Sequence, residues 1–151
     1  MEYNPYALTG KTILVTGASS GIGRAVAIEC SRLGAHVILS ARNKEKLEET
    51  LKMMEGHGHQ VIECDLSKEK EVSLLIDEVP EIQGLVNNAG TTMTVPVPFI
   101  KFNVLSDLLK VNTIAPIMIL SGLVKKKKLR ANSSVVFTSS CLLYTSDAAD
   151  D

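Results

Sequence analysis

The chain has 151 residues, of which 45% are hydrophobic and 22% are charged. This composition supplies the core of one folded domain and excludes an intrinsically disordered protein. The formal net charge of −1 provides no general attraction to nucleic acid or to a membrane surface. The three cysteines and three histidines show no metal-ligand or disulfide spacing, so we expect no bound metal and reduced thiols.

No signal-peptide pattern opens the sequence, and the longest apolar stretch, around residues 114–124, is expected to be too short and too interrupted to span a bilayer. We therefore expect a cytoplasmic protein with no membrane and no nucleic-acid partner.

Short apolar segments alternate along the chain with segments of helical periodicity. Strands are predicted over residues 12–16, 36–40, 61–64, 85–87 and 135–138, and helices over residues 21–33, 44–55, 68–78 and 103–127. Short apolar strands are typical of a parallel sheet that is covered by helices on both faces. The alternation therefore predicts a doubly wound α/β fold with five parallel strands in the order 3-2-1-4-5.

The first predicted strand leads through a glycine-rich turn, residues 16–23, directly into a helix. Such a turn directs free backbone N–H groups and the positive end of the helix dipole at one point, which suits a pyrophosphate. Gly17 and Gly21 permit the tight turn, and Gly23 lets the helix pack close to the strand. The G-x-x-x-G-x-G spacing is a weak signal alone, but its strand-to-helix context is the one that this motif requires.

Other residues suited to a nucleotide follow the later strands. Ala41 stands where an acidic residue would bind a ribose hydroxyl, and the next residue, Arg42, is a cation suited to a phosphate. The third strand ends at Asp65-Leu66, which could meet an adenine, and the fourth ends in the small residues 87–90. Each signal is weak singly.

In combination, residues 16–23, Asp65, residues 87–90, Asn112 and residues 138–140 resemble the classical short-chain dehydrogenase/reductase family over residues 10–140. The resemblance implies a Rossmann-like fold and a preference for NADP(H) through Arg42, with NAD(H) as the alternative. It also implies that a group of residues holds the cofactor: the pyrophosphate at Gly17, Ser19, Ser20, Gly21, Ile22 and Gly23, the adenine at Asp65 and Leu66, and the nicotinamide-side ribose at Asn88, Ala89 and Gly90.

The same resemblance implies that Asn112 and Ser140 are the first two members of an Asn-Ser-Tyr-Lys catalytic tetrad, with Ser139 as the rival serine. Asn112 also has a physical argument of its own. Pro116, four residues later, lacks the N–H that would bond to the carbonyl of residue 112, so this carbonyl is left to accept from another group. A proline that only shapes the helix is the alternative reading.

The function that these features imply is hydride transfer between NADP(H) and a ketone or secondary alcohol. A 3-oxoacyl-carrier-protein reductase is the first expectation, and a reductase of sugars, steroids or small alcohols is the second. The partner would be a small carbonyl or acyl-carrier substrate, and the intact protein is expected to be a homo-oligomer. A non-catalytic dinucleotide-binding module is the alternative from another class.

The lysine run 125–128 is expected to complement a helix C-terminus, and a docking patch for an acidic carrier protein is its alternative.

The Tyr-x-x-x-Lys pair of the family does not occur in the sequence, and Tyr144 is too close to Ser140 to replace its tyrosine. Residues 141–151 fit neither the fold nor the family, and they back-translate to a sequence that resembles a transposon-end adapter. We therefore expect residues 1–140 to be an incomplete NAD(P)-binding domain, truncated after its fifth strand, and residues 141–151 to be a non-native read-through tail. On this reading the fragment is inactive. Resequencing beyond codon 140 separates the enzyme from the binding module.

Overall fold

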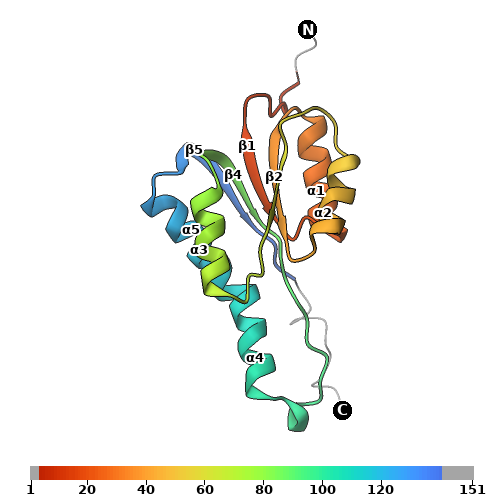
Figure 1. Cartoon of the computed structure of the whole chain (residues 1–151), viewed down its shortest axis with the longest axis vertical. Coiled ribbons are helices and arrows are strands. Elements are labelled where there is room, and N and C mark those ends of the chain that lie inside the picture. The colour runs from red at the N-terminus through yellow and green to blue at the C-terminus, as the bar shows by residue number, and fades with distance from the viewer. Residues whose placement is uncertain (1–3, 141–151) are drawn as a thin grey trace.

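The computed structural model describes residues 4–140, in which five strands form one parallel sheet in the order β3-β2-β1-β4-β5 (Figure 1). The predicted fold class and strand order are confirmed. The strands are β1 (Thr12–Thr16), β2 (His36–Ala41), β3 (Gln60–Glu63), β4 (Ile82–Asn87) and β5 (Leu129–Phe137). The helices are α1 (Gly21–Arg32), α2 (Lys44–Lys52), α3 (Glu69–Glu78), α4 (Phe102–Leu109) and α5 (Ala115–Lys125), with a 3₁₀ turn at Val97–Phe99 and a π-helical segment at Lys110–Ile114.

Helices cover both faces of the sheet and produce two cores. On the face of α1 and α2, the buried side chains include Val15, Val37 and Leu47. On the face of α3 and α5, they include Leu14 and Ile119. Because successive residues of a strand point to opposite faces, the apolar runs in β1 and β2 supply both cores at once. Helix α4 extends beyond the sheet at the edge where the strands end (Figure 1).

Strand β4 begins three residues earlier than the sequence predicted, because Gly84 lies inside it rather than before it. A Cβ atom at Gly84 would stand 3.0 Å from the Ile13 side chain, so the glycine lets the neighbouring strand β1 pack closely. Strand β5 also begins earlier, at Leu129, and its register against β4 shifts between the pairs formed by Ile82 and Gly84. The prediction rested on the apolar run at the end of β5, and residues 130–134 contain no such run.

The helix predicted over residues 103–127 is α4 and α5, joined without a break by the π-helical segment. This continuous stretch, Phe102–Lys125, has 24 residues and contains an 18-residue window with a mean hydropathy of 1.5, so by length and composition it could cross a membrane. The sequence-based expectation concerned only the apolar stretch 114–124, and the helix that contains this stretch is longer. Length and apolarity are shared by core helices, and Ile119 and Leu123 of α5 are fully buried against the sheet and α3.

The lysine run 125–128 acts mainly on a neighbouring helix rather than on the end of its own. Lys128 Nζ donates hydrogen bonds to the backbone carbonyls of Ile76 (2.9 Å), Asp77 (2.6 Å) and Val79 (2.6 Å), where α3 ends. Lys126 pairs with the Asp77 carboxylate. A cation at the C-terminus of a helix satisfies carbonyls that have no partner within the helix and complements the helix dipole. The run therefore fastens α3 to the segment that follows α5.

Replacing Lys128 by methionine keeps most of the side-chain volume and removes the ammonium donor. We expect the free energy of unfolding to fall by about 1–3 kcal/mol, because three carbonyls lose a charged partner at once. Urea denaturation followed by circular dichroism measures this loss. Lys125→Met, at an exposed position of the same run, should change the stability by less than about 0.5 kcal/mol. Equal losses in the two variants would contradict the capping role.

Candidate functional site

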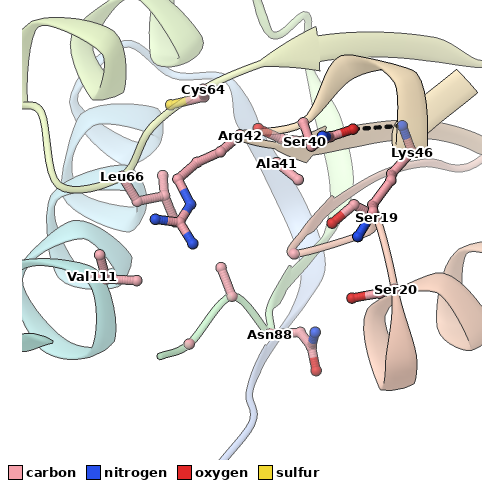
Figure 2. Close-up of a pocket in the computed structure, with 14 residues that line it drawn as sticks. Ser19, Ser20, Ser40, Ala41, Arg42, Lys46, Cys64, Leu66, Asn88 and Val111 are labelled. Atoms are coloured by element: carbon pink, nitrogen blue, oxygen red, sulfur yellow. Dashed lines mark hydrogen bonds between the residues drawn. The ribbon is translucent and has the colours of Figure 1, made fainter. Parts of the chain in front are cut away.

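A cavity of about 370 Å³ opens at the edge of the sheet where the parallel strands end (Figure 2). Its walls come from the turn after β1, the end of β2, the residues after β3 and the residues after β4. The lining residues are Gly17, Ser19, Ser20, Ser40, Ala41, Arg42, Asn43, Lys46, Cys64, Leu66, Asn88, Ala89, Gly90 and Val111. In strand order 3-2-1-4-5, β2 and β3 are added on one side of β1, whereas β4 and β5 are added on the other. Ligands of open α/β sheets bind at the point where the order of the strands switches in this way.

The glycine-rich turn packs so closely that side chains are excluded from it. A Cβ atom at Gly17 would lie 2.8 Å from Ala89 Cα, and the φ angle of Gly17 is +70°. At Gly23 a Cβ atom would lie 2.2 Å from the Gly17 carbonyl oxygen and 2.6 Å from Asn88 Nδ2. Glycine is therefore required at both positions, because any side chain would collide with backbone. The N-terminus of α1 receives no side-chain hydrogen bond from its N-cap residue, Ser20.

The end of β4 is tied to the end of β1 by a buried hydroxyl. Thr16 Oγ1 accepts hydrogen bonds from the backbone N–H groups of Asn88 and Ala89, both at 3.1 Å. In a trans peptide the C=O and the following N–H point in opposite directions. The Asn88 carbonyl is therefore directed away from Thr16, and Asn88, Ala89 and Gly90 all line the cavity.

Asp65 is held in a polar turn after β3. Its carboxylate accepts from the Ser67 backbone N–H (3.0 Å) and hydroxyl (2.8 Å), and its own N–H donates to Glu71 Oε2 (2.7 Å). Burial acts to raise the pKa of Asp65, but the hydrogen bonds from Ser67 and the nearby charges of Lys68 and Arg42 lower it overall. The group is therefore ionised at neutral pH, and it orders the turn that carries Leu66 into the cavity.

Asn112 lies in the π-helical segment, and its side chain clamps the loop after β4. Asn112 Oδ1 accepts from the Thr91 N–H (2.8 Å), and Nδ2 donates to the Thr91 carbonyl (2.7 Å). The sequence argument concerned only the backbone carbonyl of Asn112, so this side-chain clamp was missed. π-Helical segments within α-helices are frequent at functional sites, and this one places Val111 in the wall of the cavity.

The structure brings most of the predicted cofactor residues to one cavity. Those that line it are Gly17, Ser19, Ser20, Arg42, Leu66, Asn88, Ala89 and Gly90. The others border it without lining it: Gly21, Ile22 and Gly23 form the first turn of α1, Asp65 precedes Leu66, and Asn112 follows Val111. Ser140, the last described residue, stands three residues beyond β5 and is exposed. The roles assigned to all these residues stay predictions, and Tyr144 and the tail 141–151 lie outside the described residues.

Ser40, Asn43, Lys46, Cys64 and Val111 also line the cavity and were missed as site residues. For Lys46 a signal existed: it stands four residues after Arg42, in the first turn of the helix that follows β2, so both cations lie close to the end of that strand. Figure 2 shows the side chains of Arg42 and Lys46 on the cavity wall, each carrying its charged end away from the backbone of β2 and α2. For Cys64 and Val111 no local signal existed, since only the packing of β3 and of the π-helical segment brings them there.

The lining fits a phosphorylated nucleotide. The cavity combines two cations, the N-terminus of a helix and two glycines that admit close approach, which are the features that bind phosphate groups. Ser40 is 1% exposed and lines the cavity, and among residues 4–140 its hydroxyl has no hydrogen-bond partner. A buried hydroxyl without a partner costs about 1–3 kcal/mol, which a bound polar group or water can offset.

Comparison with known proteins agrees with this reading of the fold. The chain is 35% identical over 147 residues to 3-ketodihydrosphingosine reductase of Mus musculus, covering 90% of this chain and 44% of the relative. It is 45% identical over 85 residues to 3-oxoacyl-[acyl-carrier-protein] reductase of Rickettsia felis, covering 56% of this chain and 35% of the relative. The chain thus spans less than half the length of these relatives.

Among solved structures, the chain is similar to the NADP-bound 3-oxoacyl (acyl-carrier-protein) reductase of Agrobacterium tumefaciens C58. The TM-score is 0.70 and the identity 29%, over 80% of this chain and 49% of that one. The family model for short chain dehydrogenase matches residues 11–144. These residues include all five strands and the whole lining of the cavity. The chain belongs to the short-chain dehydrogenase family of oxidoreductases.

Proposed function

We propose that the complete protein is an NADP(H)-dependent oxidoreductase that interconverts a ketone and a secondary alcohol. The observation that carries the cofactor assignment is the pair Ala41-Arg42 at the end of β2, where both residues line the cavity. An acidic residue at the end of this strand would accept hydrogen bonds from the 2′-hydroxyl of NAD(H), and its charge would repel a 2′-phosphate. Ala41 provides neither interaction, and the Arg42 guanidinium provides a planar, bidentate phosphate donor.

A second cation supports the same assignment. Lys46 lies in the first turn of α2, four residues after Arg42, and lines the same cavity, so two positive charges stand on the α2 side. The neighbouring lining residues Ser19 and Asn43 are uncharged and polar. The Asn43 side chain is already used as the N-cap of α2, accepting from the Lys46 N–H at 2.8 Å. The charge on this side of the cavity is therefore positive and suits a phosphate.

The bound cofactor would supply the hydride. The residues of this chain would bind and orient it: the glycine-rich turn its pyrophosphate, Leu66 its adenine, and Asn88 to Gly90 the ribose near the nicotinamide. Asn112, through its two hydrogen bonds to Thr91, holds the loop that follows. Ser140 is proposed to orient the carbonyl of the substrate, and a downstream tyrosine to protonate it.

For the substrate, we propose a carbonyl at carbon 3 of a long-chain molecule. The names of the mouse and Rickettsia felis relatives both specify a carbonyl at position 3, as 3-ketodihydrosphingosine and as 3-oxoacyl. A reductase of sugars, steroids or small alcohols is the competing substrate class. Assaying the protein with its native downstream sequence against 3-oxoacyl thioesters and against small cyclic ketones separates the two.

Arg42→Ala tests the cofactor assignment. We expect NADPH binding to weaken by about one to two decades, because a charge-assisted contact of this kind contributes roughly 1.5–3 kcal/mol. NADH binding should change by less than about twofold, since NADH carries no 2′-phosphate. Titration of cofactor fluorescence measures both dissociation constants. Arg32→Ala, at the exposed far end of α1, is the control and should leave both unchanged. Equal losses for the two cofactors would refute the assignment of Arg42.

A further inference from the structure

A hydrogen-bond network lies next to the glycine-rich turn, and the two side chains that form it, Thr50 and Arg24, do not line the cavity. Thr50 of α2 is fully buried, and its hydroxyl lies 3.0 Å from the Ala18 carbonyl oxygen and 3.0 Å from the Lys46 carbonyl oxygen. Arg24 of α1 donates from Nε to Thr50 Oγ1 (3.0 Å) and from Nη2 to the Ser19 carbonyl (2.6 Å). Two consecutive carbonyls of the turn are therefore held by two side chains.

Holding these carbonyls also sets the direction of the N–H groups. The peptide unit is planar and trans, so the C=O of one residue and the N–H of the next point in opposite directions. The bond from Thr50 to the Ala18 carbonyl thus directs the Ser19 N–H away from Thr50. The bond from Arg24 to the Ser19 carbonyl likewise directs the Ser20 N–H away from Arg24.

The N–H groups of Ser19 and Ser20 are available to a ligand. The N–H groups of Gly17 and Ala18 already donate to the Ser40 carbonyl, at 2.8 and 3.2 Å. Among residues 4–140, no backbone carbonyl accepts from the N–H of Ser19 or Ser20, and both residues line the cavity. An ordinary glycine-rich loop could rotate these peptides at little cost, because glycine neighbours permit many backbone angles.

We propose that Thr50 and Arg24 are positioning residues, which hold the Ser19 and Ser20 peptides so that their N–H groups face the pyrophosphate of the dinucleotide. The proposal rests on the cofactor function given above. The network also joins the turn to α2, whose first turn carries Lys46. The pyrophosphate subsite and the cations proposed for the 2′-phosphate are thereby fixed relative to one another. Preorganised donors avoid the ordering cost that a mobile loop pays on binding.

The experiment measures binding of two ligands to the 151-residue chain by calorimetry. NADPH carries both the pyrophosphate and the 2′-phosphate, whereas 2′-AMP carries the adenine and the 2′-phosphate without a pyrophosphate. Thr50→Val removes the hydroxyl and keeps the shape, and Thr50→Ser restores the hydroxyl. Arg24→Met keeps the stem of a side chain that is 25% exposed and removes its donors. Arg32→Met, at the other end of α1, is the matched control.

We expect Thr50→Val and Arg24→Met each to weaken NADPH binding about tenfold, which corresponds to the loss of one well-placed hydrogen bond. Binding of 2′-AMP should change by less than about twofold, and Thr50→Ser and Arg32→Met should match the parent. A general loss of folded structure would weaken both ligands equally, and that result would overturn the proposal. If Thr50→Val does not fold, the binding measured for Arg24→Met tests the proposal by itself. A parent chain that binds neither ligand refutes the proposed cofactor function itself, whereas unaffected variants of a binding parent refute only the positioning role.

Discussion

Gly23→Ala should reduce NADPH binding by roughly a hundredfold or more, the expected result of forcing a methyl group into a space that backbone already fills. The added Cβ would lie 2.2 Å from the Gly17 carbonyl oxygen and 2.6 Å from Asn88 Nδ2. The backbone oxygen cannot move aside without shifting the glycine-rich turn, and Asn88 carries the opposite wall of the cavity. The substitution therefore disturbs the proposed pyrophosphate and ribose subsites together.

Gly10→Asn is the matched control for this variant. Gly10 has a φ of +74° and no atoms within 4 Å of an added Cβ, and asparagine tolerates that backbone conformation better than other side chains. The control should bind NADPH within about twofold of the parent. Fluorescence titration of NADPH, with thermal unfolding in parallel, separates lost binding from lost stability. A Gly23→Ala protein that binds as tightly as the control would show that the turn is not part of the site.

The thiol of Cys64 should react with iodoacetamide roughly a thousandfold more slowly, near pH 8, than a thiol of ordinary pKa. Burial, together with the smaller effect of the carboxylates of Glu71, Asp65 and Glu78, raises the pKa of Cys64 from 9.0 to about 12. Only the thiolate attacks the reagent, so the reactive fraction falls by about three decades for a shift of about three pKa units. Mass spectrometry of the labelled protein against the same chain in denaturant measures the ratio.

The same shift predicts how stability changes with pH. The folded state holds the Cys64 proton more tightly than the unfolded state, so this contribution to stability is complete below pH 9.0 and is lost as the pH rises from 9.0 to about 12. Urea unfolding at alkaline pH should show a loss that Cys64→Ala removes. Labelling of the folded protein at the rate of the denatured chain would contradict the raised pKa.

The sheet could be predicted because its signals are local. Apolar runs identified β1 and β2, and the alternation with helices fixed the parallel order once right-handed crossovers were assumed. The fourth strand was predicted to begin only after Gly84, and glycine is depleted in strands. Its place inside β4 depends on its contact with Ile13 in β1. A local sequence pattern does not show which side chain of a distant strand will pack against a given residue.

The site could be predicted only in its backbone elements. The glycine-rich turn was identified by its place between a predicted strand and a predicted helix, and Arg42 by its place at the end of the second strand. Thr50 and Arg24 were not identified, because a threonine and an arginine are common residues in predicted helices. Their importance depends on the distance between α2 and the turn, which the folded structure alone provides. Asn112 was identified by its resemblance to the family, whereas its clamp on Thr91 joins two segments that only tertiary packing brings together.

The central place of β1 imposes an order on folding. Leu14 of β1 lies opposite Ile38 of β2 on one side and Leu85 of β4 on the other. The first pairing closes a short loop through α1, and the second must close a loop about three times longer, at a higher cost in chain entropy. We therefore expect the β1-α1-β2 unit to assemble early and β4 to dock later onto the open edge of β1, before β5 pairs with β4. During synthesis on the ribosome, that edge stays unpaired until residues 82–87 have emerged, and chaperones that recognise extended apolar chain would act in this interval.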